Sequence, residues 1–194
     1  MNPTKGQTMQ RQIHLAACGL ALLLMTTFTR QAETSFYLTE KMLSAKKIEA
    51  MKKLKKEFNE LKNNPITSLG VTVGLVDNNN IFKWKISMIG PQDTPYAGGI
   101  FFLEADFPED YPINGPTIKF KTKIFHCNVF NWGICISTLN NWKPTPMVKV
   151  LSDIFALFYA NNPDNNEQPS TEYRTNRPLF EKHCREWVKL YAQP

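Results

Sequence analysis

The middle of the chain contains four strand-like runs joined by short connections, and this pattern restricts the fold more than any other feature. The runs cover residues 70–76, 81–89, 100–107 and 117–122, and the turn-forming sequence DNNN separates the first two. Parallel neighbours need crossover connections of about a dozen or more residues, which these gaps do not offer. The sequence therefore predicts an antiparallel meander with neighbouring strands in chain order.

Helices are predicted on both sides of these strands. The first has an apolar face with three- and four-residue spacing, formed by Ile48, Met51, Leu54, Phe58 and Leu61. Ser44 is placed to cap its start, and Pro65 lies just beyond its end. Similar spacing returns at Val148, Leu151, Ile154, Phe155 and Phe158, and in a closing helix at Phe180, His183, Cys184, Trp187 and Tyr191. This order predicts an α+β fold: an N-terminal helix, a four-stranded antiparallel meander sheet, a long loop and C-terminal helices.

A long, weakly periodic stretch interrupts this pattern between residues 124 and 144. A loop of this length inside a compact domain is usually functional. It contains two of the four cysteines, Cys127 and Cys135. No CxxC pair and no compact disulfide framework is present, which fits a reducing compartment where a thiol serves reactivity or packing. Taken alone, each cysteine is more often a small buried hydrophobic residue than a nucleophile.

The first forty residues differ in character from the rest. Residues 13–28 read IHLAACGLALLLMTTF, an apolar run about as long as a signal-peptide core and short for a spanning helix. Three interpretations stay open: a signal or anchor segment, an extension without function in the mature protein, and an extra packed helix. Met42 offers an alternative start. We therefore divide the chain into an N-terminal extension, residues 1–43, and a domain, residues 44–194.

Basic charge is concentrated at the start of this domain. The chain carries a formal charge of +6, and residues 46–62 contribute +4 of it, with seven lysines and three glutamates. Such a patch is compatible with a solvated helix face, nucleic acid, an anionic membrane or an acidic protein surface. The hydrophobic fraction of 42% argues against general disorder.

Four local strings together resemble the ubiquitin-conjugating enzyme family over nearly all of residues 44–192. They are YAGGIFFLEADFPEDYPINGPTIKF, HCNVFNWGICIS, NNWKPTPMVKVL and REWVKLYA, in the order and at the intervals that the family uses. The resemblance implies a carrier that holds ubiquitin as a thioester and passes it to a lysine amine or a ligase. It implies no metal and no organic cofactor. The implied partners are ubiquitin, an activating enzyme and a ubiquitin ligase, without nucleic acid, and with a membrane only if the apolar segment is retained.

The resemblance also assigns roles by position. Cys135 matches the thioester cysteine, Asn128 the amide that supports the developing oxyanion, and His126 the structural histidine of the loop. Residues on two loops match the surface that meets a ligase: Ile113, Lys143, Pro144 and Thr145. Basic residues of the first helix fall where the activating enzyme docks: Lys46, Lys47, Lys52 and Lys53.

The chain departs from the family pattern at several positions. Cys127 replaces the proline of His-Pro-Asn, which removes a fixed φ and places a second thiol beside the active segment, inviting hypotheses of a disulfide switch or of acyl exchange. Many members carry acids at two gate positions, where this chain has Ser137 and Asn165. An incoming lysine must lose a proton at this gate, because its free pKa is about 10.4.

Other functions remain open at this stage. Cys127 and the altered gate argue for a non-catalytic ubiquitin-binding scaffold on the same fold, and the retained Cys135 argues against it. A related possibility is service to another ubiquitin-like modifier. A nucleic-acid or membrane patch on the basic helix is a third hypothesis. A zinc site at His126, Cys127 and Cys135 is disfavoured by the spacing. Because the family's charging step depends on ATP, cytoplasm and/or nucleus is expected, with membrane anchoring or organelle targeting through residues 11–30 as the alternative.

Overall fold

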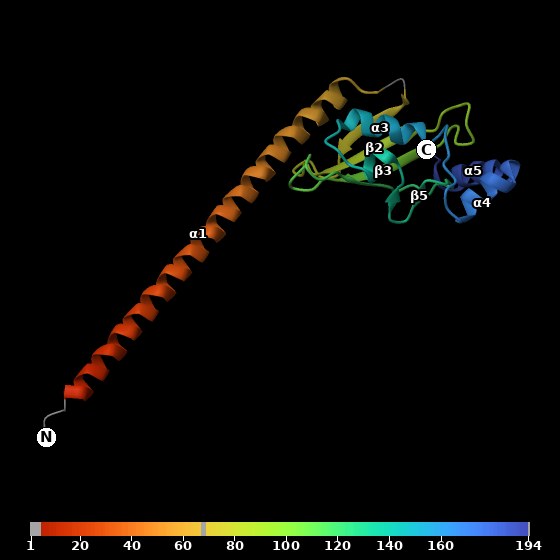
Figure 1. The fold of residues 1–194 in the computed structure, drawn as a ribbon. Helices are drawn as coiled ribbons and strands as arrows, with labels where there is room; N and C mark the ends of the chain where they lie inside the picture. Colours follow the sequence, from red (N-terminus) through yellow and green to blue (C-terminus); the bar gives the residue numbers. More distant parts are fainter. Residues whose placement is uncertain (1–4, 67–68, 194) are drawn as a thin grey trace. The chain divides into compact units, whose positions relative to one another are not determined.

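The computed structural model describes residues 5–66 and 69–193, with side chains described from residue 30 onward apart from Ala32 (Figure 1). The chain divides into two units, residues 1–45 and 46–194, which are described separately. The functional assignment of residues 1–43 as an extension stays a prediction. The apolar run at 13–28 falls where side chains lie outside the described residues.

Helix α1 spans Lys5–Asn63 and runs through the predicted start of the domain. The expected cap at Ser44 is therefore wrong, since this residue lies inside the helix. The physical reason is that no proline interrupts residues 5–63, so nothing compels the helix to begin at residue 44. Its end before Pro65 is as predicted. In the part of the chain that the structure describes, no helix has both the length and the hydropathy needed to cross a membrane.

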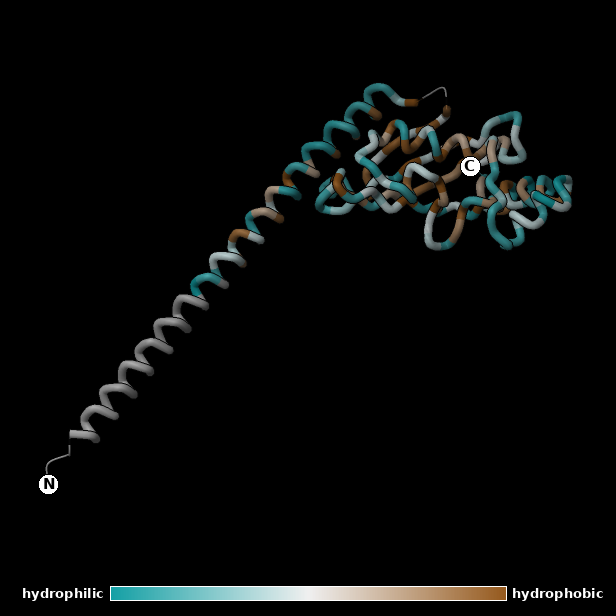
Figure 2. The backbone as a smooth tube through the Cα atoms, viewed as in Figure 1, coloured by the Kyte–Doolittle hydropathy of each residue, from teal (hydrophilic) through white to brown (hydrophobic). Residues whose placement is uncertain are grey.

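The four strands form the predicted antiparallel meander. They are β1 (Val71–Leu75), β2 (Lys83–Ile89), β3 (Ile100–Asp106) and β4 (Thr117–Phe120), in the spatial order β1-β2-β3-β4. The β1–β2 turn closes where the Asn80 amide donates to the Asp77 carbonyl at 2.9 Å. Buried and exposed side chains alternate along β2 and β3, so one face of the sheet supplies the core. Figure 2 shows the hydrophobic residues concentrated along these strands.

Helix α1 and helix α3 (Met147–Ala156) contribute much of the helical part of the core, and the closing helix adds Phe180, Cys184 and Val188. The buried face of α1 consists of Ala50, Leu54, Phe58 and Leu61, and that of α3 of Met147, Val150, Leu151, Ile154 and Phe155. Three residues predicted on apolar helix faces are exposed: Ile48 (50%), Val148 (47%) and Tyr191 of the closing helix (44%). The buried faces of α1 and α3 are centred on Leu54 and Leu151 instead. The Phe58 and Trp84 rings meet edge to face at 5.2 Å, joining α1 to the sheet.

A buried glutamate fastens α1 to two later segments. Glu57 is only 4% exposed, and its Oε2 accepts from the Tyr111 hydroxyl at 3.0 Å and from the Met147 amide at 2.9 Å. The second bond caps the first turn of α3 with a negative charge, which suits the positive end of that helix. Lys53 Nζ lies 3.1 Å from Glu57 Oε1 and compensates its charge. The proline-rich segment after β3 and the start of α3 are thus held against one helix.

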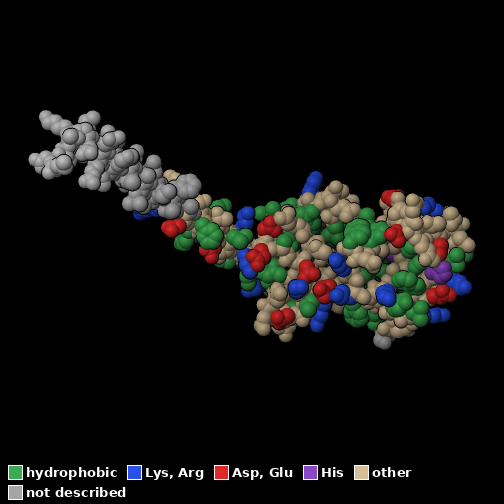
Figure 3. Space-filling view, turned by 90° about the horizontal axis from the view of Figure 1, so that it is seen from below, with side chains coloured by type: hydrophobic (Ala, Val, Ile, Leu, Met, Phe, Trp, Pro, Cys, Tyr) green, Lys and Arg blue, Asp and Glu red, His purple; other side chains and the backbone are tan. Residues whose placement is uncertain are grey.

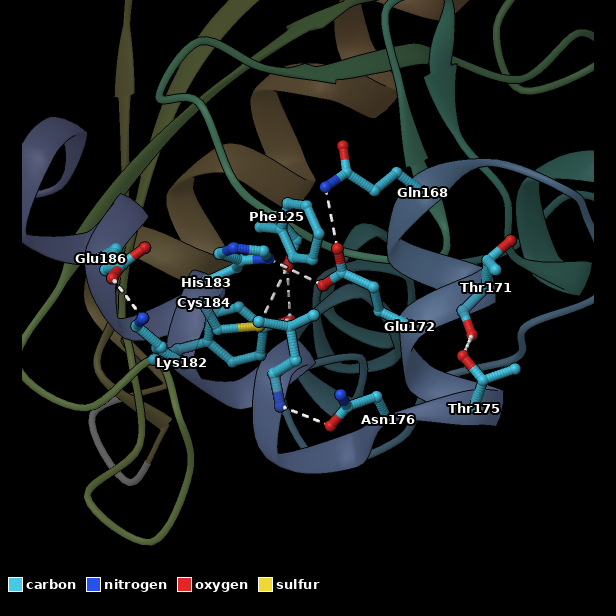
Figure 4. Close-up of polar contacts among 12 residues, drawn as sticks. Phe125, Gln168, Thr171, Glu172, Thr175, Asn176, Lys182, His183, Cys184 and Glu186 are labelled. Carbon is cyan, nitrogen blue, oxygen red and sulfur yellow. Dashed lines mark hydrogen bonds and ion pairs between the residues drawn. The ribbon is translucent and has the colours of Figure 1, made fainter.

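The chain ends in helices α4 (Gln168–Thr175) and α5 (Arg177–Tyr191). The closing helix was predicted, and α4 was not, because it is polar and buries only Ser170. Figure 4 shows the contact that joins the two: Glu172 of α4 lies 2.7 Å from His183 Nδ1 of α5. Within α4, Gln168 donates to the same carboxylate at 2.8 Å. After α5 the Ala192 carbonyl accepts from the Ile100 amide at 2.7 Å, so the end of the chain rests on the start of β3.

The predicted long loop contains three short elements of regular secondary structure. It contains a two-stranded hairpin, β5 (Val129–Phe130) with β6 (Gly133–Ile134), followed by the single-turn helix α2 (Ser137–Asn140). The fold is otherwise the predicted α+β arrangement of N-terminal helix, meander sheet and C-terminal helices.

Candidate active site

Cys135 stands immediately after the β5–β6 hairpin as a partly exposed residue. Its thiol is free and half-buried. The Cys135 amide donates to the Asn128 carbonyl at 2.8 Å, which closes the base of the hairpin. The hairpin therefore fixes the backbone of Cys135 and leaves its side chain accessible, as a nucleophile requires.

His126 is a buried brace in this segment. Its Nδ1 accepts from the Asn128 amide at 2.9 Å, so Nε2 carries the proton and donates to the Leu157 carbonyl at 2.8 Å. Burial lowers the pKa of His126 to about 4, and the ring is neutral at physiological pH. Both ring nitrogens are occupied, which suits the structural role implied for this residue and leaves no position for a general base.

Asn128 points its side chain at the loop that follows α3. The residue is 4% exposed; its Oδ1 accepts from the Asn162 amide at 2.8 Å, and its Nδ2 donates to the Asn162 carbonyl at 3.3 Å. This two-point contact fastens residues 161–166 beside the hairpin. The second Nδ2 hydrogen is not used in the bond to Asn162 and is available to a substrate oxygen. The assignment of Asn128 as the oxyanion donor stays a prediction.

Asn165 reinforces the same contact. Its Nδ2 donates to the Cys127 carbonyl at 3.1 Å, and its Oδ1 accepts from the Glu167 amide at 2.9 Å. The Cys127 amide donates at 3.4 Å to Asn161 Oδ1, a bond that a proline at position 127 could not make. The side chains of Asn161 and Asn165 thus hold the backbone of Cys127, and the Asn162 backbone holds the side chain of Asn128.

The sequence prediction missed the side chain that contacts the sulfur. Asn140 Nδ2 lies 3.3 Å from Cys135 Sγ and donates to it. Within residues 30–193 as described, it is the only side chain that donates a hydrogen bond to this sulfur. No spacing rule or motif pointed to it. Ser137, the other predicted gate residue, is exposed at the start of α2.

The other two described thiols are sealed. Cys127 and Cys184 are each 1% exposed, and burial raises the pKa of both, that of Cys184 to about 12. The hypotheses of a disulfide switch or of acyl exchange through Cys127 therefore lack an accessible second sulfur.

A family comparison accounts for this arrangement. The family model described as ubiquitin-conjugating enzyme matches residues 53–188, well over half of the chain. The chain belongs to this family. Its general activity is accordingly that of a transferase of ubiquitin conjugation, and members of the family work with ubiquitin, an activating enzyme and ligases.

In this ubiquitin-conjugating enzyme, the two loops assigned to a ligase come together. Trp142 Nε1 donates to the Pro112 carbonyl at 2.9 Å, and its ring packs on Gly115, where a Cβ would approach Trp142 Cδ2 to 2.4 Å. Gly115 is therefore needed for this contact. The residues predicted to meet a ligase lie beside it: Ile113 is 62% exposed, Lys143 and Pro144 are exposed, and Thr145 is half-buried.

The lysines assigned to the activating enzyme are exposed along α1 and partly paired. Lys47 pairs with Glu109, Lys52 lies 3.2 Å from Glu49, and Lys53 contacts Glu57. Lys46 is exposed as well. Figure 3 shows acidic and basic side chains interspersed on the face that it presents.

A groove of about 760 Å³ runs beside the active hairpin. Three basic residues are among those that line it, namely Lys119, Lys121 and Lys123. The hairpin contributes Phe130 and Trp132, whose rings stack at 4.9 Å. This volume is within the range of ligand sites in proteins. Among the described residues, no three His, Cys, Asp or Glu side chains gather as metal ligands.

Proposed function

We propose that Cys135 accepts ubiquitin as a thioester from the activating enzyme and passes it to a lysine amine or a ligase. The observation that supports this most strongly is the contrast among the described thiols: Cys135 alone is open, on a hydrogen-bonded hairpin, with an amide donor on its sulfur. Open, polar surroundings of this kind favour a reactive thiolate, whereas apolar burial suppresses it.

The chemistry proceeds in two exchanges. The Cys135 thiolate attacks the thioester carbonyl held by the activating enzyme; the new S–C bond forms as the old one breaks, and the departing thiolate takes a proton. In the second step an amine attacks the same carbonyl, the C–N bond forms, and Cys135 leaves as thiolate while the amine proton passes to solvent. A sulfur ester suits this role because it exchanges readily.

We also propose that Asn128 acts on the carbonyl oxygen in the second step. Its carboxamide is held by Asn162, so its remaining Nδ2 hydrogen has a fixed direction. A fixed donor of this kind is worth on the order of 3 kcal/mol in a transition state. Asn165 supports the loop that holds it.

The direct test is adduct formation with activating enzyme, ATP and ubiquitin. We expect a mass shift that reducing agent removes, a stable ester or no adduct in Cys135→Ser, and an unchanged thioester in the control Cys127→Ser. A normal reducible adduct in Cys135→Ser would refute the assignment.

One observation favours the alternative of a non-catalytic scaffold. Both gate positions, Ser137 and Asn165, carry uncharged side chains, and the Asn165 amide is engaged with the Cys127 carbonyl. Single-turnover discharge to free lysine separates the two proposals, because a scaffold shows no amine-dependent loss of adduct. Charging with several ubiquitin-like modifiers in parallel identifies the modifier.

The partner surfaces can be tested separately. Substituting Lys46, Lys47 and Lys52 by alanine should slow charging by the activating enzyme, since it removes charge from the proposed docking helix. Ile113→Ala should leave charging intact and weaken stimulation by a ligase, because this exposed side chain is assigned to that contact.

Because the proposed charging step needs ATP, we propose that the domain works in cytoplasm and/or nucleus. Targeting or anchoring through residues 11–30 is the alternative, and N-terminal sequencing of the mature protein distinguishes the two.

A further inference from the structure

The donor on the Cys135 sulfur lies one helical turn further along the chain. Asn140 closes α2, and its Nδ2 is 3.3 Å from Sγ. The Asn140 amide donates to the Ile136 carbonyl at 2.9 Å, so the turn that begins beside Cys135 brings this carboxamide back to it.

The turn is anchored to the larger fold. Thr138 Oγ1 donates to Asp153 on α3, and Lys149, also on α3, pairs with the same carboxylate. The Asn141 amide donates to the Ser137 carbonyl at 2.9 Å and completes the turn. Helix α2, which carries Asn140, is therefore held to α3, although the Asn140 side chain itself is exposed.

Asn128, the side-chain amide that the family resemblance assigns to the oxyanion, makes its hydrogen bonds to another loop and not to the sulfur. Asn128 uses its Oδ1 and one Nδ2 hydrogen on the Asn162 backbone. Asn140 is thus the side chain in direct contact with the reacting atom.

We propose that Asn140 is a catalytic residue that donates a hydrogen bond to the Cys135 sulfur, stabilising it as thiolate before attack and as leaving group during transfer. Its action on transfer rests on the proposed function; its action on the free thiol does not. In both steps sulfur holds the negative charge while a C–S bond is absent or breaking, and the neutral amide donates without giving up its proton. The carboxamide therefore serves both directions of the exchange.

Alkylation of the free thiol tests this without ubiquitin. The full chain is treated with iodoacetamide across a pH series, and modification of the Cys135 peptide is followed by mass spectrometry. In Asn140→Ala we expect the rate at pH 7 to fall about three- to tenfold, and the rates to converge at high pH where every thiol is ionised. Asn140→Asp, nearly identical in shape, should slow the reaction further because its charge repels the thiolate.

Asn141→Ala is the matched control, because Asn141 is also exposed and its side chain makes no hydrogen bond to Cys135. It should follow the native curve. Superposition of the Asn140→Ala and Asn140→Asp curves on the native one would overturn the proposal. A loss that persists unchanged at high pH would also overturn it, because that pattern indicates altered access.

Single-turnover discharge to lysine then tests the leaving-group role. Asn140→Ala should slow discharge about three- to tenfold, and an unchanged rate would remove this part of the proposal. If the native chain forms no thioester, the proposed function fails while the alkylation result still decides the effect of Asn140 on the thiol.

Discussion

Two cysteines stand on opposite sides of the β5–β6 hairpin, and their surroundings differ in almost every respect. Cys135 follows the hairpin, half-buried, with Asn140 on its sulfur. Cys127 precedes it, 1% exposed, with a pKa raised by burial. Only the backbone of Cys127 makes hydrogen bonds to residues 161–166: its amide donates to Asn161 and its carbonyl accepts from Asn165.

This difference shows that neighbourhood in the sequence does not make a thiol reactive. The side of the hairpin before β5 is built as a buried anchor, and the side after β6 is built to expose a side chain. Replacing the family's proline by Cys127 therefore adds a backbone donor to Asn161 and leaves the number of open thiols in the described segment unchanged.

The largest expected contrast is in thiol labelling. At pH 7.5 we expect iodoacetamide to modify Cys135 at least about 100-fold faster than Cys127 or Cys184, because modification of the buried pair requires local opening. Peptide mass spectrometry measures the three rates, and labelling in denaturant provides the control, where the rates should become similar. Comparable native rates for Cys127 and Cys135 would break the comparison.

His126, which lies in the buried segment before β5 (the anchor side of the hairpin), should make the free energy of unfolding depend on pH. Its pKa is lowered from 6.5 to about 4 in the folded state, so the unfolded chain takes up a proton first as the pH falls. Stability from this group is therefore complete above about pH 6.5 and declines toward pH 4. At pH 4.5 we expect a loss of about 2–3 kcal/mol relative to pH 7.5, measured by urea unfolding. His126→Gln is the non-titrating control; an identical pH dependence in that variant would contradict the assignment.

Asn165→Ala sharpens the comparison further. It removes the donor to the Cys127 carbonyl and the acceptor of the Glu167 amide, and should lower the free energy of unfolding by about 1–2 kcal/mol. Labelling of Cys127 should accelerate while that of Cys135 stays within about twofold, because neither lost bond involves Cys135. Asn166→Ala is the neighbouring exposed control. Equal acceleration at both thiols would show that the two sides are not independent.

The smallest effect is expected for Cys127→Ala. Loss of one buried sulfur should cost less than about 1.5 kcal/mol, since the backbone bonds to the asparagines remain. Thioester formation on Cys135 should be unchanged in rate. Denaturant unfolding and a charging assay together measure this, and a strongly impaired charging rate would assign Cys127 a direct part in the chemistry.

The sheet and the main helices could be predicted because their signals are local. Alternation along β2 and β3 and the turn before β2 determine the meander. The errors arise where local signals are weak. Ser44 has the right chemistry for a cap, yet no residue before it stops the helix, and α4 has no apolar face to reveal it.

The site was predictable only in part, for a similar reason. The strings around Cys135 and His126 carry a resemblance, and the structure brings His126, Asn128 and Cys135 onto one hairpin segment. The roles of the two side-chain amides depend on contacts of other kinds: Asn128 bonds to a segment far away in the sequence, and Asn140 reaches the sulfur through the turn of α2. Neither the pairing of Asn128 with Asn162 nor the placement of Asn140 on the sulfur leaves a sequence pattern.

The buried carboxylate of Glu57 has a consequence for how this enzyme tolerates mutation. Glu57 connects the first helix to the Tyr111 segment and to the first turn of α3, so the packing of these parts depends on one side chain. Loss of that one side chain would remove the bonds to Tyr111 and to the start of α3 together, and leave the contact between Trp142 and Pro112 to hold the two loops. Sequence variation should therefore be far narrower at this inward position than among the lysines around it on the same helix.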